Sequence, residues 1–154
     1  MTGGGSANLD RAVYDQLLRS ALESGHVPQA EELSASLSVP REEVEAALGR
    51  LAEGRVIVLS PARHATHVWM ANPFSAVPTM FRVRSEGRSY WGNCVWDALG
   101  VVALAGGSGR VETPCGDCGE AMALEVRDGD LVSGEGIVHF AVPAARWWDN
   151  IGFT

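Results

Sequence analysis

The chain contains no lysine, so all 12 of its basic residues are arginines, and 19 acidic residues outnumber them. The absence of lysine excludes a Schiff-base amine, a phosphate-loop lysine and a catalytic ammonium group together. The net charge of −7 argues against a general nucleic-acid binder, because such proteins need a cationic surface to displace counterions. With 46% hydrophobic and 20% charged residues, the 154-residue chain has the composition of a globular protein.

Cysteine is also scarce in this sequence. The chain has three cysteines, an odd number, so at least one thiol cannot lie in an internal disulfide. No signal peptide and no membrane-spanning apolar run is visible, and the first six residues, MTGGGS, are predicted to be flexible. A cytoplasmic protein with reduced thiols and no membrane partner is the simplest interpretation.

The first part of the chain has the pattern of a small helical module followed by a hairpin. The predicted elements are helices at 9–24, 29–37 and 41–53 and strands at 55–61 and 67–70. This order is typical of a winged helix and predicts an N-terminal domain over residues 1–70.

A winged helix raises the question of DNA binding. The predicted third helix argues against it, because Glu42, Glu43 and Glu45 would repel phosphates. Arg41 and Arg50 do not outweigh these carboxylates, so we expect no nucleic-acid partner.

Residues 71–154 predict a second, core domain. After a proline-containing linker at 71–78, one apolar helix runs from Cys94 to about Leu104, and the rest alternates as strands. The predicted strands lie at 79–84, 109–113, 121–126 and 131–140. The expected fold class is therefore α+β, a winged-helix-like module followed by an antiparallel-sheet core whose helix carries Cys94 and Asp97.

The start of that apolar helix has the residues of a reactive site. Asn93 is expected to cap the helix, which places Cys94 at the first helical position, where exposed amides favour a thiolate. Asp97 follows three residues later and projects from the same face as the sulfur. Without further information, a buried cysteine that packs as a small apolar residue explains the same spacing.

The other two cysteines, Cys115 and Cys118, form a CxxC motif between two predicted strands. This spacing fits half of a zinc site or a redox pair, but no second CxxC or CxxH completes four ligands. His64, His139 or Cys94 could complete a mixed site if the fold allowed it, and a β-turn with two buried cysteines is the alternative.

The segment 90–100, YWGNCVWDALG, resembles the helix start that carries the catalytic cysteine and aspartate of the organomercurial (alkylmercury) lyases. Further similar segments follow the family's order. They are NPFS at 72–75, TMFRV at 79–83, VETPC at 111–115, VHF at 138–140 and WWD at 147–149.

The resemblance implies a carbon–mercury lyase in which the Cys94 thiolate binds mercury, while Asp97 donates the proton to carbon and serves as an auxiliary ligand. It implies no organic cofactor, Hg(II) as the product metal, and a small-molecule thiol for product release. Family members use a second thiol just before the late strand, but the corresponding positions here are Glu135 and Gly136. Some relatives continue with a cysteine after Phe-Thr, where this sequence ends at Thr154.

The family's structural cysteine matches Cys115, and Cys118 has no assured counterpart. The candidate metal ligands are therefore Cys94, Asp97, Cys115 and Cys118, and the expected partner is a small organomercurial or soft-metal ligand. The leading hypothesis is a divergent or truncated lyase of this family. The alternative is a non-enzymatic member that binds a soft metal or a thiol-reactive ligand, and a weaker one is a metal-sensing winged-helix regulator.

Overall fold

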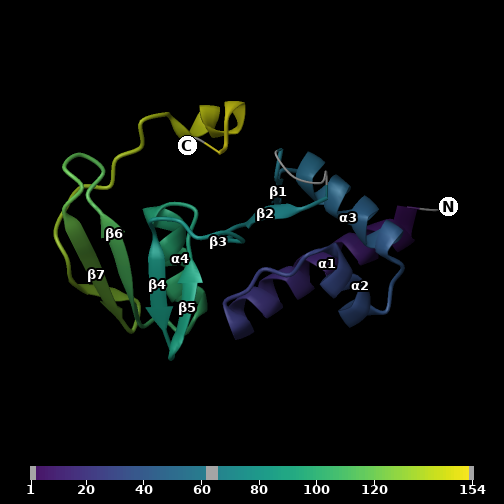
Figure 1. The fold of residues 1–154 in the computed structure, drawn as a ribbon, viewed down its shortest axis with the longest axis horizontal. Helices are drawn as coiled ribbons and strands as arrows, with labels where there is room; N and C mark the ends of the chain where they lie inside the picture. Colours follow the sequence, from purple (N-terminus) through teal and green to yellow (C-terminus); the bar gives the residue numbers. More distant parts are fainter. Residues whose placement is uncertain (1–2, 62–65, 153–154) are drawn as a thin grey trace.

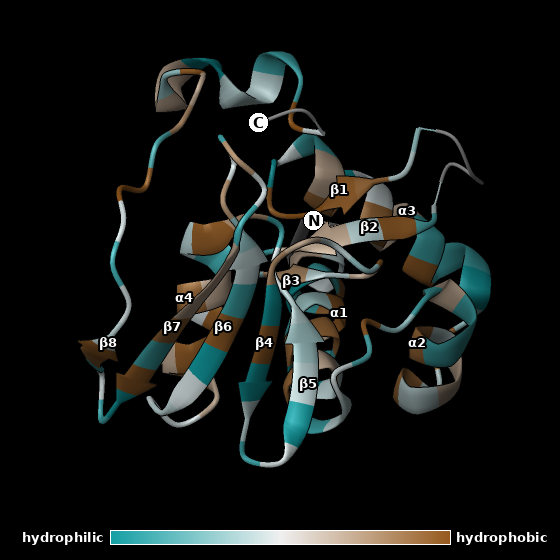
Figure 2. Cartoon of the chain, turned by 60° about the vertical axis from the view of Figure 1, so that its left-hand side comes forward, coloured by the Kyte–Doolittle hydropathy of each residue, from teal (hydrophilic) through white to brown (hydrophobic). Residues whose placement is uncertain are grey.

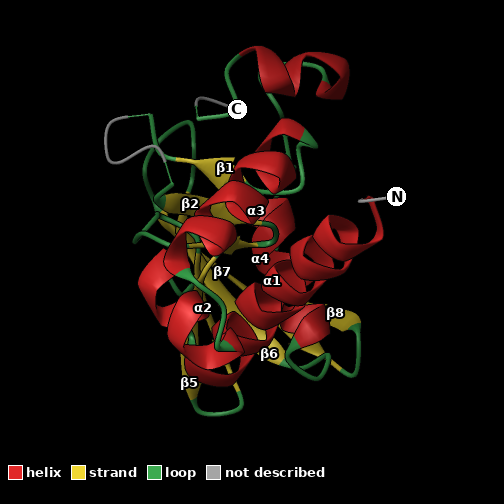
Figure 3. Ribbon diagram, turned by 90° about the vertical axis from the view of Figure 1, so that its right-hand side faces the viewer, coloured by secondary structure: helices red, strands yellow, loops and turns green. Residues whose placement is uncertain are grey.

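The computed structural model describes residues 3–61 and 66–152, with helices grouped at one end of the molecule and a larger antiparallel sheet at the other (Figure 1). The helices of the first part are α1 (Gly3–Ser24), α2 (Ala30–Leu37) and α3 (Arg41–Glu53). Both α1 and α2 pack against α3. Figure 3 views the molecule from the helical side, where these helices lie in front of the strands. Apolar residues at helical spacing form their shared core, including Val13, Leu17, Leu33, Val44 and Leu48.

The first helix begins earlier than predicted. Residues Gly3 to Ser6 are helical, so the prediction of a flexible start is wrong for them. Gly5 and Ser6 are exposed and add little packing. The helix is anchored by the buried stripe further along, and adding a residue to an existing helix costs much less than starting one.

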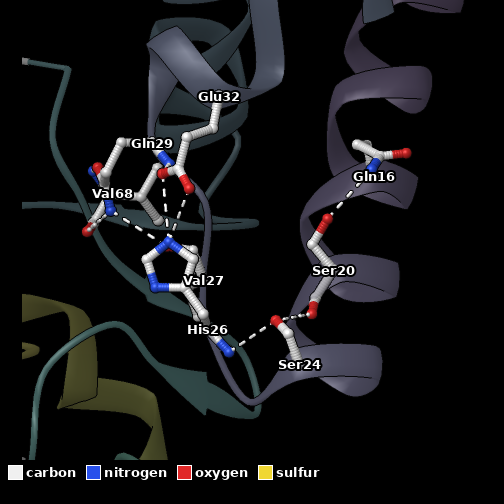
Figure 4. Close-up of polar contacts among 8 residues, drawn as sticks. All are labelled: Gln16, Ser20, Ser24, His26, Val27, Gln29, Glu32 and Val68. Carbon is white, nitrogen blue, oxygen red and sulfur yellow. Dashed lines mark hydrogen bonds and ion pairs between the residues drawn. The ribbon is translucent and has the colours of Figure 1, made fainter. Parts of the chain in front are cut away.

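The start of α2 is tied to the next part of the chain. Gln29 precedes the helix and forms a capping box with Glu32. The Gln29 amide also accepts from the backbone N–H of Val68 at 2.8 Å and donates to its carbonyl at 3.2 Å. Glu32 additionally pairs with His26 at 2.9 Å (Figure 4). These contacts hold the loop between α1 and α2 against Val68, a residue of the small sheet described next.

A small antiparallel sheet of order β1-β2-β3 follows the helices. Its strands are β1 (Val58–Leu59), β2 (Val68–Ala71) and β3 (Phe74–Ser75). The predicted strand at 55–61 is mostly turn, because Arg55 takes a left-handed conformation with φ 59° just after α3. The helix–hairpin order is as expected. The winged-helix assignment and the boundary at 70/71, which falls inside β2, stay predictions.

The larger sheet has the order β5-β4-β6-β7-β8 and is antiparallel throughout. Its strands are β4 (Arg82–Ser85), β5 (Arg88–Trp91), β6 (Gly109–Pro114), β7 (Ala121–Arg127) and β8 (Asp130–Ser133). Helix α4 (Val95–Leu104) covers β4 and β6 and buries Ala98, Val101 and Val102 with Val83 and Val111 (Figure 2). The α+β fold class is confirmed.

The helices and the larger sheet share one hydrophobic core. The fully buried Tyr90 of β5 donates its hydroxyl to the carbonyl of Leu22 in α1 at 2.9 Å. Gly25 follows α1 with φ +76°, where a Cβ would collide with the Ser89 carbonyl oxygen. Strand β5, which leads to Cys94, is thus held directly by the helical part.

The predicted late strand at 131–140 is wrong beyond Ser133, where β8 ends. Gly134 and Gly136 have φ of 124° and 145°, conformations that a paired strand does not use. After this extended segment, Ala144–Asp149 forms a short 3₁₀ helix.

The C-terminal segment, yellow in Figure 1, then returns to the small sheet. The Arg55 guanidinium lies over the Trp148 ring at 5.6 Å, and Gly152 lies against the Trp69 ring. No helix in the described part of the chain combines the length and apolarity needed to cross a bilayer.

Candidate functional site

The candidate site lies where β5 ends and α4 begins. At this junction Gly92 donates to the carbonyl of Phe81 at 2.9 Å and accepts from the Thr79 hydroxyl at 2.6 Å. A Cβ on Gly92 would lie only 2.7 Å from the backbone nitrogen of Ala98. The junction therefore requires glycine, because the chain passes directly against the first turn of α4.

Cys94 itself is the N-cap of α4, which corrects the expectation that Asn93 caps the helix. Its backbone is extended, with φ −142° and ψ −179°, and its carbonyl already accepts from Ala98 at 2.9 Å. The Cys94 sulfur accepts from the backbone N–H of Asp97 at 3.4 Å. The sulfur therefore takes the place that an oxygen usually fills at a helix start.

Asn93 has another role, which sequence reasoning missed. Its Nδ2 donates to Oδ1 of Asn72 at 3.0 Å and contacts the carbonyl of Pro73 at 3.4 Å. Its side chain also lies close enough to the Asp97 carboxyl to lower the pKa of that group. Because Asn72 and Asn93 are far apart in sequence, no local pattern indicates their contact.

Cys94 and Asp97 are brought together as predicted, and both are half-buried. Their side chains hydrogen-bond to one another. Burial raises the pKa of the Cys94 thiol, the nearby Asp97 carboxylate raises it further, and the backbone N–H groups of Asp97 and Trp96 oppose the shift. The expected lowering by the helix start is present, but burial outweighs it.

The pKa of Asp97 is also raised, chiefly because burial disfavours the carboxylate. The hydrogen bonds from Asn93 and Cys94 act in the opposite direction and do not cancel the effect of burial. A half-buried carboxyl with a raised pKa, in contact with a thiol, is arranged for proton transfer.

Cys115 and Cys118 lie together on the turn between β6 and β7. Cys118 is exposed, so the alternative of two buried cysteines is wrong for it. The turn is closed by bonds from Cys115 N to the Glu120 carbonyl at 2.7 Å and from Gly119 N to the Cys115 carbonyl at 2.9 Å. The Cys115 sulfur accepts from the backbone N–H groups of Cys118 and Asp117 and from the Cys118 thiol, which lower its pKa.

The candidate ligands form two pairs rather than one cluster. Across residues 3–61 and 66–152, no group of three or more His, Cys, Asp or Glu side chains is placed to hold a metal ion. His64, a candidate fourth ligand, lies outside the described residues. All three cysteines are free thiols.

The positions expected to match the family's second thiol lie on the extended segment after β8. Glu135 is exposed, and Gly136 has φ +145° with its Cβ position 2.9 Å from Met122. Neither position supplies a sulfur.

Comparison with known proteins gives a consistent result. The family model of alkylmercury lyase (MerB) matches residues 74–154. Among solved structures, the mercury-bound form of MerB2 superposes with a TM-score of 0.58 at 18% sequence identity, covering 82% of this chain and 66% of that chain. No curated protein matches. The chain thus spans just under two thirds of this structural neighbour, and the likeness to it establishes the fold.

Proposed function

The chain belongs to the alkylmercury lyase family, and from that premise we propose that it cleaves carbon–mercury bonds by protonolysis at Cys94 and Asp97. The observation that carries this proposal is the contact between a thiol and a carboxyl at the start of α4, both with raised pKa. One side chain supplies the soft ligand for mercury and the other supplies the proton.

The raised pKa of Cys94 fits a thiol that loses its proton only when mercury binds. In the proposed first step, the sulfur bonds to the mercury of R–Hg⁺, and its proton passes to the Asp97 carboxylate with which it is hydrogen-bonded. The products of this step are R–Hg–S–Cys94 and a neutral Asp97 carboxyl. Binding of the substrate thereby protonates the carboxyl that later donates the proton to carbon.

In the second step the Asp97 carboxyl gives its proton to the carbon, the carbon–mercury bond breaks, and R–H leaves. The mercury stays on the Cys94 sulfur, and the new Asp97 carboxylate becomes its second ligand. One small-molecule thiol then replaces Asp97 on the mercury and gives its proton to that carboxylate. A second replaces Cys94 and gives its proton to the Cys94 sulfur, so that Hg(II) leaves as a complex with both small thiols. Asp97 finally loses its proton to solvent, which restores the starting state. The small thiol supplies the second sulfur that Glu135 and Gly136 do not provide.

Asn93 is the proposed positioning residue for the acid. It is held by Asn72 at 3.0 Å and reaches the Asp97 carboxylate, so it fixes the direction of the carboxyl. The contribution of such orientation is typically lost when the supporting side chain is shortened.

A second candidate function is binding of a soft metal without cleavage. The observation that favours it is the absence of a cysteine near residues 135 and 136. We keep metal sensing on DNA as the weakest candidate, because Arg50 pairs with Asp10 at 2.6 Å and Arg41 pairs with Glu45 at 2.8 Å. These arginines of α3 already pair with carboxylates, so their charge is less available to DNA phosphates. A reduced cytoplasmic setting suits any of the three proposed functions.

The test is to measure release of hydrocarbon from an organomercurial in the presence of a small thiol. Asp97→Asn should still take up the compound but release hydrocarbon roughly 10²- to 10⁴-fold more slowly, the usual contribution of a general acid. Cys94→Ser should lose both uptake at this site and cleavage, while keeping the helix, since serine is a good N-cap. If the wild-type chain binds one equivalent and releases no hydrocarbon, the binding function replaces the lyase.

A further inference from the structure

The turn between β6 and β7 is a second thiol site that the proposed cleavage does not use. Its two free thiols, on Cys115 and Cys118, are three residues apart on one closed turn. They stand on a closed hairpin turn, and in the described residues they do not join Cys94 or Asp97 in a group of three or more possible metal ligands. Two thiols held at this spacing form a chelate for a metal ion that prefers sulfur.

The backbone of the turn is already arranged around the first sulfur. Backbone N–H groups of Asp117 and Cys118 point to the Cys115 sulfur, and Gly119, with φ +77°, turns the chain back into β7. Such donors stabilise the charge of a metal-bound thiolate without competing for the metal. Cys118 is exposed, so an ion can reach its sulfur from solvent.

The number of ligands decides which ion the turn suits. In the described residues no third His, Cys, Asp or Glu completes this pair. A structural zinc ion takes four protein ligands, so it fits poorly. Hg(II) is satisfied by two thiolates, and the soft sulfur pair selects it over the harder divalent ions.

We propose that Cys115 and Cys118 form a dithiol site that binds Hg(II) independently of Cys94. Two S–Hg bonds form, two thiol protons pass to solvent, and no electron is transferred. When Hg(II) arrives as a complex with two small thiols, those thiols leave with the two protons. The use of the site as acceptor for mercury released at Cys94 rests on the proposed function, whereas binding itself does not.

The experiment uses the reduced full chain, Hg(II) chloride and an excess of a monothiol, with bound mercury counted by native mass spectrometry. Cys94→Ser should retain one Hg(II) per chain. Adding Cys118→Ser should weaken retention against the monothiol by about 10²-fold, because the chelate is lost. Adding Asp117→Asn instead, which alters the same turn but leaves both sulfurs, should leave retention intact.

Three outcomes would overturn the proposal. The first is loss of all bound mercury in Cys94→Ser, which would assign the metal to Cys94. The second is equal retention with and without Cys118. The third is a Cys115–Cys118 disulfide that persists under the reducing conditions of the assay. Failure of the lyase proposal is separate, because it is measured as hydrocarbon release by the wild-type chain, whereas mercury retention is measured in Cys94→Ser.

Discussion

The two cysteine sites of this chain shift the pKa of a thiol in opposite directions. Cys94 is half-buried at a helix start, and burial raises the pKa of its thiol although backbone amides reach it. Cys115 lies on a surface turn, and hydrogen bonds from Cys118 and Asp117 lower the pKa of its thiol. Amide donors are present at both sites, and the largest cause of the difference is the desolvation of Cys94, which the charge of Asp97 reinforces.

The comparison separates two uses of sulfur. A thiol that keeps its proton beside a carboxyl suits a reaction in which the proton is needed, as proposed at Cys94 and Asp97. A thiol that loses its proton readily suits simple capture of a soft ion, as proposed at Cys115 and Cys118. The predictions below test the packing, the reactivity and the charges on which this contrast depends.

The largest expected effect concerns packing beneath the two sites. Gly92→Ala should lower the free energy of unfolding by about 1–3 kcal/mol, because its Cβ would collide with Ala98 of α4. Gly116→Ala in the exposed turn meets no atom within 4 Å and should be neutral or slightly stabilising. Urea unfolding of both variants is the measurement, and equal losses would show that the Cys94 junction is no more tightly packed than the turn.

The next largest effect is expected in the alkylation rates of the Cys94 and Cys115 thiols. At neutral pH, iodoacetamide should label Cys115 faster than Cys94 by about tenfold or more, because only the thiolate reacts and burial also limits access. Peptide mapping of a time course gives both rates in one sample, and Cys115→Ser should leave the rate at Cys94 unchanged. Equal rates at the two cysteines would contradict the assigned environments.

Much of the fold follows from the sequence, because local patterns decide it. The buried stripe Val44, Ala47, Leu48 and Leu51 identifies α3, and its bounds are as predicted. The late strand fails because the pattern of apolar residues after Ser133 does not reveal the positive φ of Gly134 and Gly136. Glycine permits such angles without requiring them.

At the site, sequence spacing correctly predicts that the side chains of Cys94 and Asp97 meet, since three residues make nearly one helical turn. The direction of the Cys94 pKa shift could not be predicted in the same way. Burial depends on β3 and β4 packing against α4, and the Asn72–Asn93 contact joins segments 21 residues apart. Neither fact is contained in the local sequence.

A smaller effect is expected in the pH dependence of stability. Because the pKa of Asp97 is raised on folding, the folded chain binds this proton more tightly than the unfolded chain does. Below the ordinary value of 3.8 the carboxyl is protonated in both states, and stability is lost as pH rises from there through the raised value. Asp97→Asn removes this loss, so its unfolding free energy relative to wild type should rise over that interval and then level off.

Thermal unfolding of both chains across this pH range is the measurement. Only the change of the difference with pH is interpreted, so constant effects of the asparagine on the helix start cancel. A difference that stays flat, or that favours wild type as pH rises, would mean that Asp97 is not desolvated in the folded state.

The smallest effect is expected from Asp117, beside Cys115 and Cys118, and it completes the comparison, since an aspartate neighbours a thiol at each site. Asp97 raises the pKa of Cys94 both by its charge and by accepting a hydrogen bond from the thiol, whereas Asp117 raises the pKa of Cys115 by charge alone, the weakest of the causes acting there. Water and salt screen an exposed charge more than a half-buried one.

Asp117→Asn should therefore speed alkylation of Cys115 by about twofold or less, and added salt should remove the difference. Asp97→Asn should speed alkylation of Cys94 by a larger factor that persists in salt. If the two substitutions gave equal factors with equal salt dependence, the Cys94 site would be as well hydrated as the turn, and the proton relay proposed between Cys94 and Asp97 would lose its physical basis.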